Sequence, residues 1–293
     1  NYGEMTNKGM EIDLGFDIID TAEFGLSTAI NWSTNENEVT DLFGTESINL
    51  SPGASVSSRA VVGYPLGSLY GTGSQTNPDG SFILNSNGFP QITSSPIVLG
   101  DPNPDWRGGI SLSMRYKKFR LNAVLEHSEG GDFSPRTLWV LNRFGTTQET
   151  ANRLTLDQPL INYRGNTIPA GTTVRGNVRD FGGGPVLLDE NWYRTGIGGG
   201  FGDNQAYNFS IADATFTKLR DLSLSYVIDT PLVTNIGLSD VIVSVTGRDL
   251  ININNVEGID PEINTKGVSV AQGVEYFTNP QTKGFLFSLT INY

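Results

Sequence analysis

The sequence contains no cysteine, a single histidine and only three methionines. The absence of cysteine excludes disulfides, thiolate metal sites and a cysteine nucleophile, and it is compatible with any redox compartment. A catalytic triad or a histidine metal cluster cannot be built on His127 alone. We therefore expect no enzyme activity, no resident metal and no cofactor, and we expect His127 to be a solvated residue at the rim of the fold.

Positive charge is also scarce. The 293 residues include 19 Lys and Arg against 31 Asp and Glu, which gives a net charge of −12 and a pI near 4.5. Binding to a phosphate backbone requires clustered basic side chains. The sequence therefore predicts that nucleic acid is not a partner.

Long apolar runs are missing as well. No stretch approaches the roughly 18 consecutive apolar residues of a transmembrane helix. The first residues, Asn1-Tyr2-Gly3, show neither the charged segment nor the apolar region of a signal peptide. We expect the chain to be the tail of a longer protein.

What the sequence has in abundance is glycine and alternation. The 35 glycines are about 12% of the chain, against ~7% in an average protein. Apolar and polar residues alternate in seven segments, at 10–19, 24–33, 110–116, 119–126, 222–226, 241–246 and 285–293. A period of two residues predicts strands with two chemically different faces. The expected fold is therefore all-β and antiparallel.

The connections between these strands have very unequal lengths. Short turns at 20–22, 117–118 and 229–239 alternate with long polar connections at 34–106, 128–213 and 251–281. Long unstructured loops are uncommon in compact soluble domains, whereas transmembrane barrels combine short periplasmic turns with long extracellular loops. If the last strand ends in the periplasm, all three short turns lie on the periplasmic side. This sorting favours an antiparallel transmembrane β-barrel.

The spacing of two aromatic residues agrees with that fold. Trp106 and Tyr116 share the apolar face and lie about 33 Å apart along a strand at ~3.3 Å per residue. A tilt of ~45° projects this to roughly 23 Å, close to the ~25 Å apolar band of membrane barrels. A large soluble β-sandwich or β-helix also has alternating strands and glycine-rich loops, and it is the alternative fold.

On the barrel interpretation, each row of apolar residues faces lipid. The expected lipid-facing residues are Ile110, Leu112, Met114, Leu222, Leu224, Val241, Val243, Val245, Phe285, Phe287, Leu289 and Ile291. Strict alternation places Lys218 and Arg220 on the same side of their strand as Leu222 and Leu224. It likewise places Lys283 on the same side as Phe285 and Phe287. We expect these three to be outward basic anchors just above the hydrocarbon, near lipopolysaccharide phosphates, unless a β-bulge reverses the parity.

The opposite face carries charge. Glu11, Asp13, Asp17, Arg115, Arg120 and Glu126 are expected to point into the barrel.

Candidate binding residues lie in the second long connection. Carbohydrate recognition uses aromatic faces beside hydrogen-bonding groups, and the residues of this kind are Trp139, Trp192, Tyr193, Tyr207 and Asn208. The alternative is that these aromatic residues pack the connection against itself or against a lid.

Two further patterns suggest sites only at first sight. The glycine runs at 182–184 and 196–202 match no phosphate-binding motif and are expected to be loops. Asp249, Asp260 and Glu262 offer oxygen ligands for Ca²⁺, but without the spacing of an EF-hand, and the sequence does not decide whether a loop binds this ion.

Several motifs resemble the C-terminal half of the SusC/RagA family of TonB-dependent outer-membrane transporters. They run through the chain in the family's order, as Asn1–Glu11, Asn31–Val39, Val62–Pro65, Leu99–Gly109, Tyr116–Phe119 with Leu121–Asp132 after it, Lys218–Tyr226, Val243–Asn255 and Gly258–Glu262, followed by an aromatic C-terminal strand. One departure is Asp249, where the family usually has Asn in its Gly-x-Asn-Leu motif.

The resemblance implies the C-terminal portion, about seven strands, of a plugged barrel of about 22 strands. Residues 1–293 would supply barrel wall and extracellular loops, and the plug domain and first strands would lie outside this chain. The implied partners are outer-membrane lipid and lipopolysaccharide, the rest of the barrel and plug, TonB acting through the plug, and a SusD-like surface lipoprotein. The implied location is the outer membrane of a Gram-negative bacterium.

The function implied by the resemblance is TonB-dependent active import of a bulky nutrient, either an oligosaccharide or a peptide. Two alternatives stay open at this point, a passive outer-membrane porin and a secreted soluble β-rich binding module. A plug domain and a TonB box in the upstream sequence would distinguish the transporter from a porin. Partition into the detergent-soluble membrane fraction, rather than the aqueous one, would distinguish it from a soluble binding module. The sequence does not identify the substrate.

Overall fold

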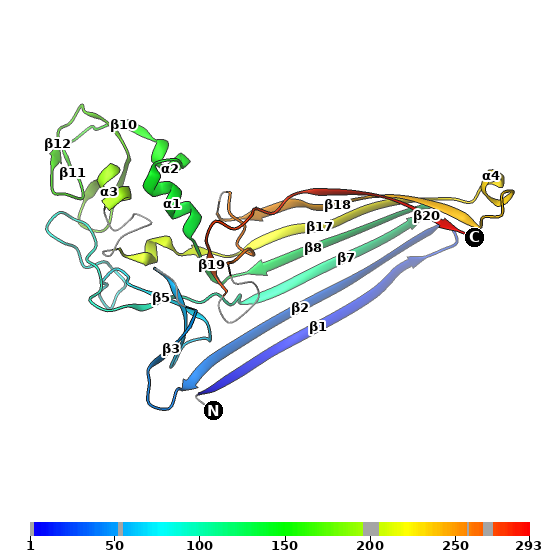
Figure 1. The fold of residues 1–293 in the computed structure, drawn as a ribbon, viewed down its shortest axis with the longest axis horizontal. Coiled ribbons are helices and arrows are strands. Elements are labelled where there is room, and N and C mark those ends of the chain that lie inside the picture. Colours follow the sequence, from blue (N-terminus) through cyan, green and yellow to red (C-terminus); the bar gives the residue numbers. More distant parts are fainter. Residues whose placement is uncertain (1–2, 52–54, 196–204, 257, 266–271) are drawn as a thin grey trace.

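The computed structural model describes residues 3–51, 55–195, 205–256, 258–265 and 272–293. Its main element is a seven-stranded antiparallel sheet whose spatial order is also the chain order (Figure 1). The strands are β1 (Glu4–Asp20), β2 (Phe24–Asp41), β7 (Trp106–Tyr116), β8 (Phe119–Glu129), β17 (Phe216–Ile228), β18 (Asp240–Asn254) and β20 (Gly284–Asn292). The expectation of seven antiparallel strands is confirmed.

Several strands are longer than their alternation indicates. β2 continues to Asp41 and β18 continues to Asn254, so the long connections begin later than residues 34 and 251. The β2 extension is polar on both faces in the run from Thr34 to Glu38, so it has no period-2 signal, and its backbone pairing with β1 extends it. The β18 extension alternates Ile251 and Ile253 with Asn252 and Asn254, a period-2 pattern that the sequence interpretation assigned to the connection.

The long connections contain secondary structure of their own. Residues between β2 and β7 form a sheet of β3 (Ser47–Ser51), β4 (Ser57–Val61), β5 (Ser68–Gly71) and β6 (Ile97–Gly100). Those between β8 and β17 include β9 (Asp132–Pro135), α1 (Arg136–Phe144), α2 (Gln148–Ala151), α3 (Glu190–Thr195), η1 (Tyr207–Ser210) and β16 (Ala212–Asp213). Three small ribbons pair β10 (Arg153–Thr155) with β13 (Thr173–Arg175), β11 (Leu160–Ile161) with β12 (Thr167–Ile168), and β14 (Asn177–Asp180) with β15 (Pro185–Leu188).

All the long connections gather at one end of the sheet. In the third of them, β19 (Val274–Glu275) joins β9 and β16 in a small sheet. The other end of the sheet carries the short turns, of which one contains α4 (Pro231–Thr234), and the C-terminus (Figure 1). Within the described residues, no helix has the length and apolar character needed to cross a membrane.

The strand register sorts the side chains into two faces. Residues directly opposite each other on antiparallel strands point to the same side of the sheet. Ile110 lies opposite Leu125, and Leu125 lies opposite Leu219, so these three share one side. By the same pairing, every residue expected to face lipid lies on this side, which we call the apolar face. The opposite side, the polar face, carries Glu11, Asp13, Asp17, Arg115, Arg120 and Glu126.

A β-bulge in β17 overturns the expected outward direction of two basic residues. The register shifts between Leu219 and Asp221, which leaves Arg220 as an extra residue. Leu219 and Leu222 therefore both lie on the apolar face although they are three residues apart, and Lys218 lies opposite Glu126 on the polar face. The prediction that Lys218 and Arg220 are outward anchors is wrong, because a bulge reverses the parity of every residue before it. Lys283 precedes β20 and is exposed, so its anchoring role stays a prediction.

The strand facing this bulge is irregular at Asp249. Asp249 has a φ of 50°, in the left-handed region that Asn and Asp enter more readily than other residues with a side chain. This conformation gives a physical reason why the Gly-x-Asn-Leu motif accepts Asp at this position.

We expect Asp249→Asn to leave stability nearly unchanged and Asp249→Val to lower the free energy of unfolding by about 1–2 kcal/mol. Urea unfolding of the folded full-length protein measures both values. Thr290→Val, at an ordinary strand position of β20, is the control and should be neutral. Equal stability of Asp249→Val and Asp249→Asn would contradict the left-handed conformation.

Candidate functional site

A cluster of charged side chains lies on the polar face where β17 meets the third long connection. We call it the Lys218 cluster, and it consists of Lys218, Arg220, Glu126, Asp260 and Glu262. The Lys218 side chain is 0% exposed. Its Nζ donates to both Asp260 carboxylate oxygens at 2.8 and 2.7 Å and to Glu262 Oε2 at 2.7 Å. A buried ammonium group with this set of acceptors is fully paired.

Arg220 completes the cluster from the bulge position. Its guanidinium forms a bidentate pair with Glu262 at 2.8 and 2.6 Å, and its Nε donates to Glu126 Oε2 at 2.6 Å. Bidentate arginine–carboxylate pairs are among the strongest charge-assisted hydrogen bonds. The bulge therefore places a second cation where it ties Glu262 of the connection to Glu126 of β8.

The electrostatics of the cluster keep Glu262 ionised. Partial burial raises the pKa of Glu262, but the hydrogen bonds from Arg220 and Lys218, and the two positive charges, outweigh it and hold the pKa at about 2. The carboxylate is therefore charged at neutral pH, and the segment that carries Asp260 and Glu262 is fastened to the wall of the sheet.

The same contacts involve the three carboxylates that the sequence offers as possible Ca²⁺ ligands. The oxygens of Asp260 and Glu262 are occupied by the Lys218 ammonium and the Arg220 guanidinium, and Asp249 lies 3.6 Å from Arg220. Within the described part of the chain, no group of three or more His, Asp or Glu is arranged to hold a metal ion. In this structure, the Asp260 and Glu262 carboxylates pair with protein cations.

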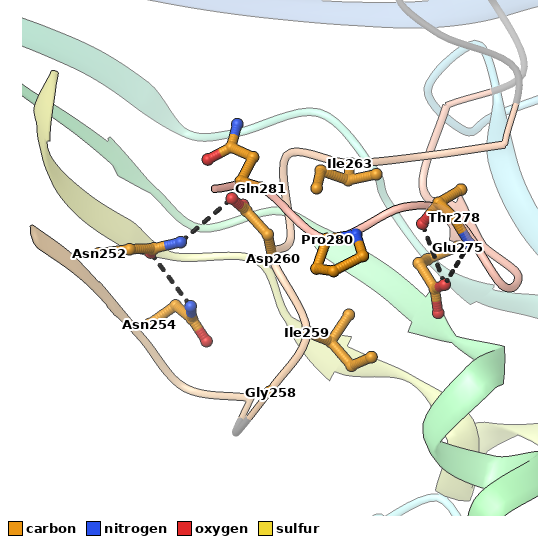
Figure 2. A pocket seen from close by; sticks show the side chains of 10 residues that line it. All are labelled: Asn252, Asn254, Gly258, Ile259, Asp260, Ile263, Glu275, Thr278, Pro280 and Gln281. Carbon is orange, nitrogen blue, oxygen red and sulfur yellow. Dashed lines mark hydrogen bonds between the residues drawn. The ribbon is translucent and has the colours of Figure 1, made fainter. Parts of the chain in front are cut away.

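A cavity of about 260 Å³ lies beside the cluster (Figure 2). Asn252 and Asn254 enter it from the end of β18, and Asp260 and Gln281 enter it from the third connection. Figure 2 shows that Asn252 donates to Asp260 and that Asn254 donates to Asn252, each at 3.1 Å. Such a wall of amides and carboxylates suits hydroxyl or peptide groups. The volume is below the ~300–1,000 Å³ of typical small-molecule sites, so the cavity has room for one unit of a larger ligand.

Two of the predicted binding aromatic residues are buried instead. Trp192 and Tyr193 lie in an apolar core beneath the loop surface, and the Trp192 ring centroid is 5.6 Å from that of Phe89 and 5.5 Å from that of Phe181. The prediction that Trp192 and Tyr193 contact substrate is therefore wrong for this structure. Long-range packing of the second connection against residues 82–92 of the first covers both side chains.

The other predicted binding residues are half-buried and lie in two places. Tyr207 and Asn208 belong to η1, next to the same core, and Asn208 Oδ1 accepts a hydrogen bond from the Ser74 N–H at 2.8 Å. Trp139 lies on α1, and its buried indole Nε1 has no hydrogen-bond partner among the residues that the structure describes. The five residues do not form one surface, and a substrate role for Trp139, Tyr207 and Asn208 stays a prediction.

The sequence interpretation missed an exposed aromatic pair in the third connection. Tyr276 and Phe277 lie edge to face with ring centroids 4.9 Å apart, and the Arg136 guanidinium lies over the Tyr276 ring at 4.7 Å. Phe277 has a φ of 48°, an unusual conformation for an aromatic residue. The sequence signal that could have identified this pair is the occurrence of two adjacent aromatic residues in an otherwise polar connection.

His127 is less solvated than expected. Its Nδ1 lies 2.8 Å from Thr217 Oγ1, its Nε2 lies 2.9 Å from Glu129, and its ring packs on Trp106 with centroids 4.8 Å apart. The glycine run 182–184 forms a turn in which Gly182 and Gly184 donate to the Asp180 carboxylate. The run 196–202 lies outside the described residues.

We expect Tyr193→Phe to loosen the loop core without affecting the seven-stranded sheet. The phenol donates to Glu149 at 3.0 Å and accepts from Asn177 at 2.8 Å, and burial together with the Glu149 charge raises its pKa and keeps it protonated. Loss of the hydroxyl removes one hydrogen bond from each partner inside the loop core and should cost about 1–3 kcal/mol locally.

Hydrogen exchange of residues 136–195 measures this loss, with exchange of β17 and β18 as the internal control. If Tyr193 contacted substrate rather than packing the loop, ligand binding would fall while exchange stayed unchanged.

No protein-family model matches this chain. Two curated proteins align with it over its whole length. The chain is 24% identical to TonB-dependent receptor P3 of Formosa agariphila over 326 aligned positions, and 24% identical to TonB-dependent receptor P26 of the same organism over 322 positions. Each match covers 100% of this chain, and 29% and 30% of the relatives.

The fold has counterparts among solved structures. A structure of the RagAB peptide transporter matches 99% of this chain with a TM-score of 0.63 at 18% identity, and a structure of the RagAB peptide importer in the open-open state matches 99% with a TM-score of 0.62. The chain covers 30% and 29% of those proteins.

These matches agree with the order of the sequence motifs and with the seven-stranded sheet. They concern about three tenths of each relative, and they confirm the fold class of a TonB-dependent barrel. The matches therefore agree with the resemblance to the SusC/RagA family: the chain is similar over its whole length to TonB-dependent receptors and shares the fold of the corresponding part of the RagAB structures.

Proposed function

We propose that this chain is the C-terminal barrel portion of a TonB-dependent transporter in the outer membrane of a Gram-negative bacterium. The protein imports a bulky nutrient, either an oligosaccharide or a peptide. The observation that carries the proposal is one continuous apolar face on seven antiparallel strands, in a chain similar over its whole length to TonB-dependent receptors.

Lipid is the proposed cover of the apolar face. Phe287 and Leu289 are 79% and 64% exposed, and they lie opposite Val245 and Val243 in one uninterrupted apolar surface. Soluble monomers rarely expose apolar patches larger than a few hundred Å². Among the described strands, β1 and β20 each pair on one side only, and open edges in lipid leave backbone groups unsatisfied. The rest of the barrel supplies the missing neighbours.

The polar face is the proposed inner wall. Glu11, Asp13 and Asp17 face the space that the plug occupies, and TonB acts on the transporter through that plug. The Lys218 cluster fastens the third connection to the wall, and the loops together form the extracellular surface for substrate and for a SusD-like lipoprotein. The RagAB structures are of a peptide transporter, which supports a peptide as one of the two substrate classes.

Uptake by cells that produce the full-length protein tests the proposal. Labelled oligosaccharides and labelled peptides are offered to these cells, to cells without the transporter gene, and to cells without TonB. We expect uptake of one class to require both the transporter and TonB. Uptake that persists without TonB would indicate a passive porin, and recovery of the protein in the aqueous fraction would indicate a soluble binding module.

A further inference from the structure

The turn between β17 and β18 presents apolar side chains at the short-turn end of the sheet. Leu232 is 84% exposed and Ile236 is 72% exposed. Leu232 lies in α4 and Ile236 lies two residues after its end, and because the helical turn continues to Asn235 the two residues, four apart, project to the same side. Val233 and Leu238 turn back and are partly buried. The exposed pair is therefore a defined feature of this turn.

The turn is held by hydrogen bonds and does not depend on a partner for its shape. The N–H groups of Val233 and Thr234 donate to the Thr230 carbonyl, and the Asn235 N–H donates to the Pro231 carbonyl. The Ser239 N–H donates to the Asn292 carbonyl of β20. Leu232 and Ile236 are thus presented on a structured support.

The same turn lacks charge. Residues 230–239 contain no Lys, Arg, Asp or Glu, and Asp229 before them is paired with Lys118. The other two short turns are charged, with Asp20 and Glu23 in one and Lys117 and Lys118 in the other. An uncharged apolar turn can enter the polar–apolar boundary of a membrane without desolvating an ion.

The turn continues an aromatic row on the apolar face. Phe24, Tyr116, Phe119 and Tyr226 lie opposite one another across β2, β7, β8 and β17. Ring centroids are 6.5 Å apart for Phe24 and Tyr116 and 4.7 Å apart for Phe119 and Tyr226. Aromatic girdles of this kind mark the membrane–water interface of barrels. The turn begins three residues after Tyr226, and Figure 1 shows α4 beyond the strand ends.

We propose that Leu232 and Ile236 insert into the lipid headgroup region of the periplasmic leaflet and anchor this edge of the barrel. Apolar side chains at such an interface lie about 5–10 Å deep, at the boundary between headgroups and acyl chains. The inference rests on the proposed function, because it requires the apolar face to be in a bilayer. The occupant is lipid rather than the plug or a periplasmic protein.

Environment-sensitive labels on single cysteines test the proposal. This chain has no cysteine of its own, so the full-length protein, freed of any other cysteine, receives Leu232→Cys, Ile236→Cys or Asn235→Cys. Each variant carries an NBD label and is reconstituted in phosphatidylcholine vesicles, and only the heat-modifiable folded fraction is measured. Leu289→Cys on the apolar face is the reference for bilayer insertion.

We expect blue-shifted emission at positions 232 and 236, quenching by lipid-borne nitroxides and loss of quenching by aqueous iodide. Position 235 should stay accessible to iodide. If position 289 is quenched by lipid while 232 and 236 respond to iodide, the anchor is refuted and the proposed function stands. Shielding of 232 and 236 from both quenchers would indicate a protein contact and also refute the anchor. Absence of lipid quenching at 289 would refute the proposed function itself.

Discussion

Replacing Lys218 with methionine should lower the free energy of unfolding by about 3–5 kcal/mol, because removing one partner of a buried ion pair leaves the other charge uncompensated. Asp260 is buried and would lose its ammonium partner, whereas Glu262 is partly exposed and would keep Arg220. Urea unfolding of the folded full-length protein measures the loss. Faster proteolysis of the third connection should accompany it, since this connection would lose its attachment to β17.

A surface lysine provides the matched control. Lys117 is exposed and lies 3.7 Å from Glu23, so Lys117→Met should cost about 0–1 kcal/mol. Adding Asp260→Asn to Lys218→Met should restore part of the stability, because it removes the buried charge that the first substitution leaves. Equal losses for Lys117→Met and Lys218→Met would contradict the burial of the cluster.

The same cluster predicts how stability depends on acid. Glu262 has a pKa of about 2 in the folded protein, below its ordinary value of 4.5. A carboxyl whose pKa is lowered by folding stabilises the protein fully above its unfolded pKa, and this contribution is lost as the pH falls through the folded pKa. Stability should therefore decline between about pH 5 and pH 2, and Glu262→Gln should make this decline shallower. Parallel pH profiles of the two proteins would contradict the pairing of Glu262 with Arg220 and Lys218.

Leu289→Arg should lower the yield of folded barrel, whereas Ser288→Arg should leave it nearly intact. Leu289 is the central residue of the row from Phe285 to Tyr293, so it is placed nearest the middle of the apolar band. An arginine on the lipid face costs roughly 2–4 kcal/mol near the bilayer midplane. Ser288 lies opposite Ser244 on the polar face, where water or polar groups solvate the guanidinium.

Heat-modifiable folded protein in the outer membrane measures both variants in the same strain. Removal of Tyr293 should also lower assembly, because the proposed barrel strand β20 would lose the aromatic residue that directly follows it. Equal loss from the two arginine variants would mean that the apolar face is not in lipid, and the proposed function would fail with it.

The sequence by itself determined the strands that have an apolar face. Alternation is a local property, readable over a few residues, and each row such as Val241, Val243 and Val245 needs no distant contact to be recognised. The short turns followed for the same reason, and strands joined by short turns pair with their neighbours. The pairing within each of the three hairpins and the two faces of each strand could therefore be predicted from the sequence, and the family resemblance implied that the hairpins continue one another in a barrel wall.

Only the tertiary structure shows where the alternation of the two strand faces is interrupted. Nothing in the sequence around Arg220 marks it as a bulged residue, and one extra residue moves Lys218 from the expected outer side to the polar face. The partners of Lys218 lie 42 and 44 positions further along the chain, where they resemble calcium ligands until the ammonium is placed among them.

Trp192 illustrates the same limit in the loops. Its aromatic neighbours include Phe89, more than a hundred residues earlier, so its burial depends on how two polar connections fold together. A period-2 pattern in the sequence predicts which face of a strand lies in apolar surroundings. Bulges, ion pairs and loop cores arise from contacts between distant segments, and only the packed chain specifies those contacts.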